Sequence, residues 1–152
     1  MSKISYIEDL MSWSNEFSFF EPVKVRFSET DMFGHLNNTV PFTYFEQARI
    51  QYFTHVGFMN EWANPKHEAI PVVANLQCDF LKQVFFGETI RMFVKVNEAG
   101  TSSMDLHYMG KNEKDEIVFV GRGTMVQISS KTGKAIPWTE QEKLLLERKA
   151  RL

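Results

Sequence analysis

A short polar stretch, residues 29–38, holds the groups of this chain that are best suited to chemistry: ETDMFGHLNN. Asp31 follows a segment of alternating residues, and Asn38 opens a long apolar segment. If the apolar segment is a helix, its first N–H groups have no intrahelical partner and carry the positive end of the helix dipole. Such donors suit a developing oxyanion, and a carboxylate beside them can attack a carbonyl or activate a water. Gly34 would allow the sharp turn between the two groups.

The same residue types also form an ordinary turn followed by a helix cap, without any catalysis. Composition and spacing alone leave both interpretations open. A metal site is not expected, because Asp31 and His35 have no third ligand nearby and the other histidines are scattered along the chain.

The segment after the turn, residues 39–57, is predicted to be a buried helix with Asn38 as N-cap and Gly57 as C-cap. At about 100° per residue, its apolar side chains cover about half of the circumference, which is wider than the stripe of a surface helix. Arg49 projects into this apolar arc. A cation there needs a partner, and Glu46, one turn earlier, is the expected one.

Alternating apolar and polar residues predict strands on both sides of this helix. Val23, Val25 and Phe27 alternate with polar residues before the turn, and residues 1–20 are expected to form an ordered arm or a short helix. The segments predicted after the helix are strands at 71–84, 88–96, 103–110 and 117–129 and a C-terminal helix at 139–152, capped by Thr139 and Glu142. Tight polar turns indicate an antiparallel meander, so the predicted fold is α+β, with a curved antiparallel five-stranded sheet wrapped around a long central helix. The outer face of such a sheet would stay partly apolar, which favours dimerisation.

The composition is that of one globular domain spanning residues 1–152. A net charge of −2 gives no reason to expect a nucleic-acid partner. No apolar run approaches the roughly 20 residues that a membrane span needs, and Glu8 and Asp9 stand where a signal peptide would be apolar. Cys78 has no second cysteine to pair with, so we expect a reducing, cytoplasmic location and a role for Cys78 as a small core residue.

Residues 25–49 resemble the signature of the hotdog-fold acyl-CoA thioesterases of the 4-hydroxybenzoyl-CoA thioesterase type. The motifs that carry the resemblance are D-x-x-G-H-[LV]-N-N and, on the following helix, Y-F-E-x-A-R. The resemblance implies a hotdog fold and hydrolysis of an acyl-CoA thioester without a metal or bound organic cofactor. It implies that Asp31 is the nucleophile or general base and that the backbone N–H of Asn38 polarises the carbonyl. It also implies an active site at a subunit interface of a homodimer or homotetramer.

Four further residues match or border these motifs. His35 is expected to orient the turn or to take part in the catalytic site, and Gly34, Asn37 and Pro41 are expected to border the substrate. Pro41 falls in the first turn of the predicted helix, where its missing N–H would have no partner. Because many relatives carry a tyrosine there, Pro41 would reshape the acyl pocket, and the resemblance does not identify the acyl group.

Two other functions stay open at this point. One is a non-catalytic hotdog module that binds acyl-CoA or an acyl-carrier protein. The other is an acyl-thioester hydratase or dehydratase that uses Asp31 and His35 as acid and base. For either, or for a thioesterase, the phosphates of coenzyme A need cations, and the candidates beside predicted strands are Lys82, Arg91, Lys95 and Arg122.

Overall fold

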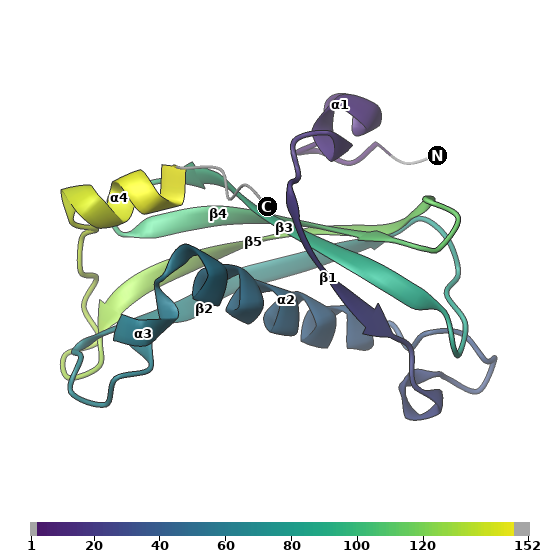
Figure 1. The fold of residues 1–152 in the computed structure, drawn as a ribbon, viewed down its shortest axis with the longest axis horizontal. Coiled ribbons are helices and arrows are strands. Elements are labelled where there is room, and N and C mark those ends of the chain that lie inside the picture. Colours follow the sequence, from purple (N-terminus) through teal and green to yellow (C-terminus); the bar gives the residue numbers. More distant parts are fainter. Residues whose placement is uncertain (1–2, 148–152) are drawn as a thin grey trace.

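A long helix, α2 (Val40–Val56), lies along the concave side of a five-stranded antiparallel sheet in the computed structural model, which describes residues 3–147 (Figure 1). This is the α+β arrangement that the sequence predicts. No helix within the described residues is long and apolar enough to cross a bilayer. The other elements are β1 (Phe19–Lys24), β2 (Ala69–Phe80), β3 (Thr89–Ala99), β4 (Ser103–Lys111), β5 (Ile117–Ser129), the 3-10 turn η1 (Phe27–Glu29), and the helices α1 (Leu10–Ser14), α3 (Met59–Trp62) and α4 (Glu140–Glu147).

The strand order is β1-β3-β4-β5-β2, so the predicted meander is correct only for β3, β4 and β5. Helices α2 and α3 carry the chain across the concave side, and β2 therefore pairs with β5 at the edge opposite β1. This pairing places Phe80 of β2 opposite Phe119 of β5. The last five residues of the C-terminal helix predicted at 139–152 lie outside the described residues, and its capping box is present, with Thr139 and Glu142 bonding each other's backbone N–H.

The first strand differs from its prediction. It ends at Lys24, and Phe27, which the alternation placed in the strand, begins η1 and is 75% exposed. The cause is local, because a carboxylate oxygen of Glu29 accepts the backbone N–H of Arg26 at 2.8 Å. This side-chain bond closes a tight local turn just past the end of the strand.

The predicted wide apolar arc of α2 is confirmed. Tyr44, Phe45, Ala48, Tyr52 and Phe53 are all buried between the helix and the sheet. The helix ends as predicted at Gly57, which has a left-handed φ of 98°.

Arg49 is 8% exposed in the same apolar layer. Its predicted partner is confirmed, with Arg49 Nη2 at 3.7 Å from a carboxylate oxygen of Glu46. The pair is loose, since the Glu46 side chain is mostly exposed and Arg49 Nη1 is buried without a partner among residues 3–147. Burial raises the pKa of Tyr108 on β4, and the positive charge of Arg49 opposes this rise.

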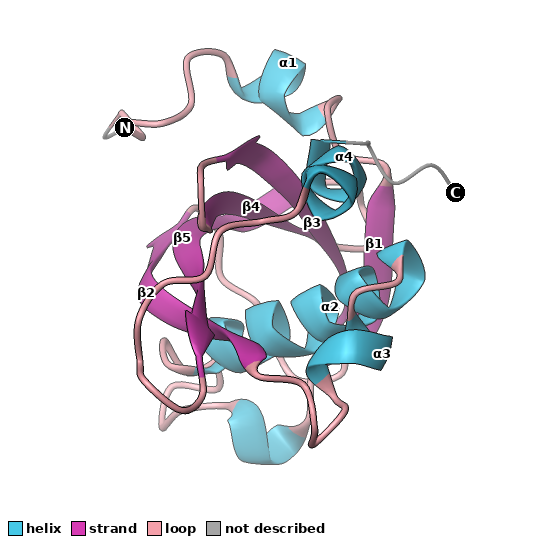
Figure 2. Cartoon of the chain, turned by 90° about the vertical axis from the view of Figure 1, so that its left-hand side faces the viewer, coloured by secondary structure: helices cyan, strands magenta, loops and turns pink. Residues whose placement is uncertain are grey.

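The convex side of the sheet is covered by the N-terminal segment, so the expectation of an open outer face is wrong over this area. Figure 2 shows α1 on the side of the sheet opposite α2. Ile7, Trp13 and Phe17 form a second core there with Met109 and Val120 of the sheet. Dimerisation, inferred in part from an open face, stays a prediction.

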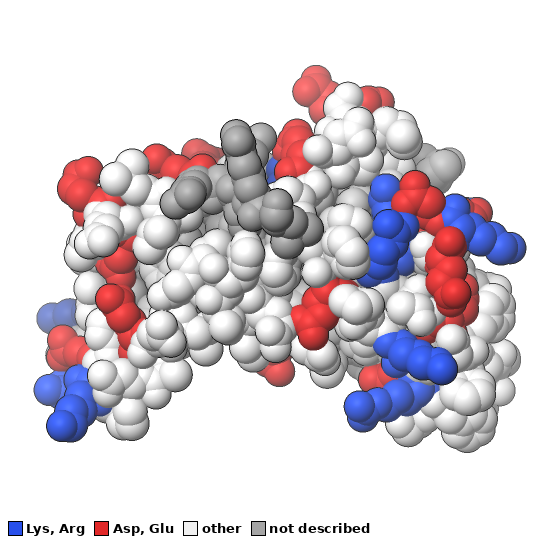
Figure 3. Space-filling model, viewed as in Figure 1, with Lys and Arg blue, Asp and Glu red and all other residues white. Residues whose placement is uncertain are grey.

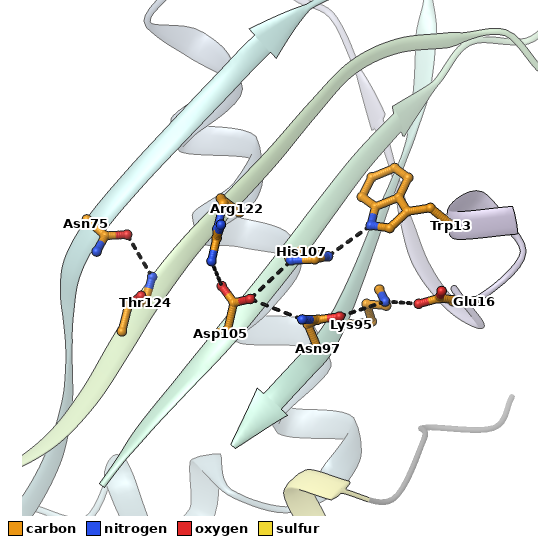
Figure 4. Close-up of polar contacts among 9 residues, drawn as sticks. All are labelled: Trp13, Glu16, Asn75, Lys95, Asn97, Asp105, His107, Arg122 and Thr124. Carbon is orange, nitrogen blue, oxygen red and sulfur yellow. Dashed lines mark hydrogen bonds and ion pairs between the residues drawn. The ribbon is translucent and has the colours of Figure 1, made fainter. Parts of the chain in front are cut away.

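A buried polar network anchors this segment (Figure 4). The indole N–H of Trp13 donates to Nδ1 of His107 at 2.9 Å. Nε2 of the same ring lies 3.2 Å from Asp105, which also accepts from Arg122 at 3.2 Å. His107 is 2% exposed, and its burial lowers the imidazole pKa to about 4. An indole N–H only donates, so Nδ1 must be unprotonated, and the folded state holds a neutral ring.

We expect acid to destabilise the fold through His107. The folded ring stays neutral down to about pH 4, whereas an unfolded histidine takes up a proton near pH 6.5. The unfolded state then binds more protons, so the free energy of unfolding should fall by about 2 kcal/mol between pH 7.5 and pH 5. Urea unfolding at both pH values measures this change.

His107→Gln is the matched variant, because glutamine can accept from Trp13 and donate to Asp105 but does not titrate. The variant should show a clearly smaller pH dependence than the wild type. Equal pH dependence in both proteins would mean that His107 is not the responsible group.

Candidate active site

A cleft of about 540 Å³ lies where residues 31–38 meet the end of β2. Of the residues that the sequence selected, the structure brings Asp31, His35 and Asn38 together in this cleft. Gly34, Asn37 and Pro41 do not line it. The complete lining consists of Asp31, His35, Leu36, Asn38, Phe80, Leu81, Lys82, Gln83, Val84 and Phe119.

The Asp31 side chain organises the turn in which it lies. One carboxylate oxygen, Oδ1, accepts the backbone N–H of Phe33 at 2.9 Å and that of His35 at 3.1 Å. Gly34, with a φ of 79°, allows the chain to fold back between them, as the sequence predicts. The other oxygen, Oδ2, has no hydrogen-bond partner among residues 3–147. The carboxylate is thus held in place through Oδ1, and Oδ2 is available to form other bonds.

The start of α2 differs from its prediction by one residue. Thr39, not Asn38, is the N-cap, and its side chain makes no capping bond. Asn37 does the capping, since its side-chain oxygen accepts the N–H of Thr39 at 3.1 Å and its carbonyl accepts the N–H of Val40 at 3.0 Å. The N–H of Asn38 has no acceptor within the described part of the chain. Asn38 therefore lines the cleft with its N–H unbonded, just before the positive end of a 17-residue helix.

Pro41 is the second residue of α2 and is buried. A proline is tolerated here because the first N–H groups of a helix have no intrahelical partner. Pro41 is not among the residues that line the cleft.

His35 lines the cleft but is not paired with Asp31 through its ring. Its backbone N–H bonds the Asp31 carboxylate, and its backbone forms a bridge with Phe85. The imidazole lies edge-on to the Phe85 ring, with centroids 5.1 Å apart and an interplanar angle of 79°. The ring has no hydrogen bond to a residue that the structure describes. Asp31 and His35 thus line one cleft without a hydrogen bond between their side chains.

The apolar wall of the cleft was not found by sequence reasoning. Its main members, Phe80 and Phe119, come from β2 and β5, which meet only because β2 crosses to the far edge of the sheet. The only signal in the sequence is that Phe80 lies late in one alternating run and Phe119 lies at the start of another.

The four cations considered for phosphate binding each lie beside a carboxylate. Lys82 alone lines the cleft, and it is paired with Glu116. The remaining pairs are Arg91 with Asp115, Lys95 with Glu16 and Arg122 with Asp105. On the face drawn in Figure 3, Lys and Arg side chains mostly stand next to Asp and Glu.

Cys78 is half-buried against the main core, as predicted. Burial raises the pKa of its thiol to about 12. A thiol with so high a pKa is protonated at neutral pH and is not a nucleophile.

Comparisons with known proteins identify the family and agree with the fold. A family model described as "Thioesterase-like superfamily" matches residues 25–145. The uncharacterized protein YsmA of Bacillus subtilis (strain 168) is 48% identical over 140 residues, which cover 91% of this chain and 92% of that protein. A DHNA-CoA thioesterase from Staphylococcus aureus is similar in structure, with a TM-score of 0.73, 27% identity and 80% of each chain covered. A thioesterase from Thermus thermophilus, complexed with coenzyme A and Zn, has a TM-score of 0.72 and 27% identity, covering 86% of this chain and 93% of that one.

Proposed function

This chain belongs to the thioesterase-like superfamily, and we propose that it hydrolyses the thioester bond of an acyl-CoA, releasing a free acid and coenzyme A. Membership confirms the resemblance and the hotdog fold that the sequence predicted. Thioester hydrolysis is the general activity that the family supports. The substrate and the residues that act on it are our proposal.

One observation carries the assignment of residues. Asp31, which has a free carboxylate oxygen, and Asn38, which has a free N–H among the described residues, line the same cleft. In our proposal the N–H of Asn38 bonds the thioester oxygen as it becomes negative, and Asp31 acts on the carbonyl carbon. Both groups are held by backbone bonds of one short turn, so little reorganisation is needed during the reaction.

Two routes fit this arrangement. As a general base, Asp31 removes a proton from water, the hydroxide adds to the carbonyl carbon, and the C–S bond breaks to release the thiolate of coenzyme A. As a nucleophile, Asp31 displaces the thiolate and forms an anhydride, which water then hydrolyses. Single turnover in ¹⁸O-labelled water separates them, because only the nucleophilic route can leave label in the Asp31 carboxyl group.

Thiol release from a panel of aliphatic and aromatic acyl-CoAs tests the proposed activity. An aromatic member is included because one similar structure is a DHNA-CoA thioesterase, and the other holds coenzyme A. Saturable binding without turnover of any member would instead identify a binding module. Water addition to an enoyl-CoA would identify a hydratase.

We also propose that the active protein is a homodimer or homotetramer with the cleft at a subunit interface. The cleft is open to solvent on one side, where Phe80 is 52% exposed, and β2 is an edge strand with one unpaired side. Analytical ultracentrifugation should therefore show a dimer or a tetramer at working concentrations. A protein that is strictly monomeric and fully active would contradict the interface.

A further inference from the structure

We propose that the hydrogen bond between Tyr44 and Glu29 has a positioning role. It holds the Asp31 carboxylate and the Asn38 N–H in fixed positions relative to each other. The inference rests on the proposed function, since it concerns the same cleft. Glu29 is the last residue of η1, and Tyr44 lies on α2. Neither residue is assigned a role by the motif.

Glu29 connects three parts of the chain. A carboxylate oxygen accepts the Tyr44 hydroxyl at 2.7 Å and the backbone N–H of Arg26 at 2.8 Å. Its backbone carbonyl accepts the N–H of Asn37 at 2.8 Å. One residue thereby joins the end of the first strand, the central helix and the far end of the turn.

The two ends of the turn meet at this point. Glu29 stands two residues before Asp31, and Asn37 stands directly before Asn38. The bond between Glu29 and Asn37 therefore closes the turn next to both groups that we assign to the reaction. Because the bond to Tyr44 ties Glu29 to α2, it also holds Asp31 and the Asn38 N–H in place relative to the start of that helix.

Tyr44 is a rigid support for this bond. It is 2% exposed in the second turn of α2, inside the main core. Its burial, together with the nearby Glu29 carboxylate, raises the pKa of the hydroxyl far above its usual value. The hydroxyl is therefore protonated at neutral pH and can donate to Glu29.

The pair acts from outside the cleft. Glu29 and Tyr44 line a separate hollow of about 550 Å³ between β1 and α2, which includes neither Asp31 nor Asn38. The reacting cleft in turn includes neither Glu29 nor Tyr44. They are positioning residues, and their loss should affect the placement of the reacting groups more than substrate binding.

Steady-state kinetics of Tyr44→Phe is the direct test. Removing one hydroxyl should lower kcat about 10-fold while KM stays within about 2-fold, because a small misplacement of reacting groups affects the chemical step. Glu29→Ala should show the same loss, and the double variant should lose no more than either single variant. Glu29→Gln keeps a side-chain oxygen as acceptor and should retain most of the activity.

Tyr52→Phe is the matched control. Tyr52 is 3% exposed on the same helix, and the backbone near its hydroxyl is that of Val96 on β3, not that of the turn. This variant should lose stability but keep kcat. If Tyr44→Phe and Tyr52→Phe behave alike in kcat, the Tyr44 bond is merely structural and the inference is wrong.

Amide hydrogen exchange tests the device independently of turnover. In Tyr44→Phe the N–H of Asn37 should exchange at least about 10-fold faster than in the wild type, with the amides of β5 unchanged. Unchanged exchange at Asn37 would overturn the inference. A wild type that hydrolyses no acyl-CoA would overturn the proposed function. Amide exchange at Asn37 would still test whether the Tyr44 bond holds the turn in place.

Discussion

Replacing Asp31 with asparagine should lower kcat for acyl-CoA hydrolysis at least about 100-fold, because one positioned carboxylate supplies the base or the nucleophile. Asparagine keeps a side-chain oxygen that can still accept the N–H groups of Phe33 and His35. The turn should therefore survive while its charge is lost. Initial rates of thiol release with the best substrate of the panel measure the effect, and urea unfolding checks that the variant is folded.

Asp9→Asn is the matched control. Asp9 also uses its carboxylate to accept a local backbone N–H, that of Ser12 at the start of α1, far along the chain from the cleft. The same chemical change at this position should leave kcat unaltered. Equal activity of Asp31→Asn and the wild type would show that Asp31 is not the catalytic residue.

Gly121→Ala should destabilise the fold by about 3 kcal/mol, as expected for overpacking a rigid site. An added Cβ would lie 2.4 Å from a ring carbon of Phe45 and 2.8 Å from the backbone oxygen of Gln77. The ring cannot retreat, since Phe45 is fully buried and stacked on Tyr108 with centroids 4.4 Å apart and an interplanar angle of 12°. Urea unfolding at neutral pH measures the loss.

Gly133→Ala serves as the comparison. A Cβ at Gly133 meets no atom within 4 Å, and only its left-handed φ of 73° opposes the change. That strain is worth about 1 kcal/mol. Shrinking the opposing ring with Phe45→Leu should recover part of the stability lost in Gly121→Ala, whereas Gly133→Ala should gain nothing from it. If both glycine variants lose the same free energy, close approach of Phe45 is not what requires a glycine at position 121.

The parts of the fold that could be predicted are those decided by residues close together in sequence. The bounds of β5, predicted at 117–129, are observed at Ile117–Ser129, because a long alternating run between polar turns leaves little choice. The first strand was misplaced because the chain turns into η1 after Arg26, whose N–H bonds the Glu29 side chain, and alternation carries no information about such a bond.

The candidate site also has a part that could be predicted from local sequence and a part that could not. Asp31 and Asn38 lie in one turn, so their proximity followed from the motif and the predicted helix. Phe80 and Phe119 are brought together only by the position of β2 in the sheet, which local patterns do not encode. The covering of the convex side by residues near Trp13 was likewise invisible, because its partner His107 is 94 residues away.

Because Trp13 and His107 are 94 residues apart, the N-terminal segment can dock only after much later parts of the chain have been synthesised. The segment around Trp13 leaves the ribosome first, yet the surface on which it rests requires Met109 and Val120, which are made much later. Its apolar side chains cannot be buried on the sheet until β5 has been synthesised and has paired with β4. Contacts between such distant residues form slowly. The segment around Trp13 is therefore made before the surface that receives it and can dock only after that surface has formed.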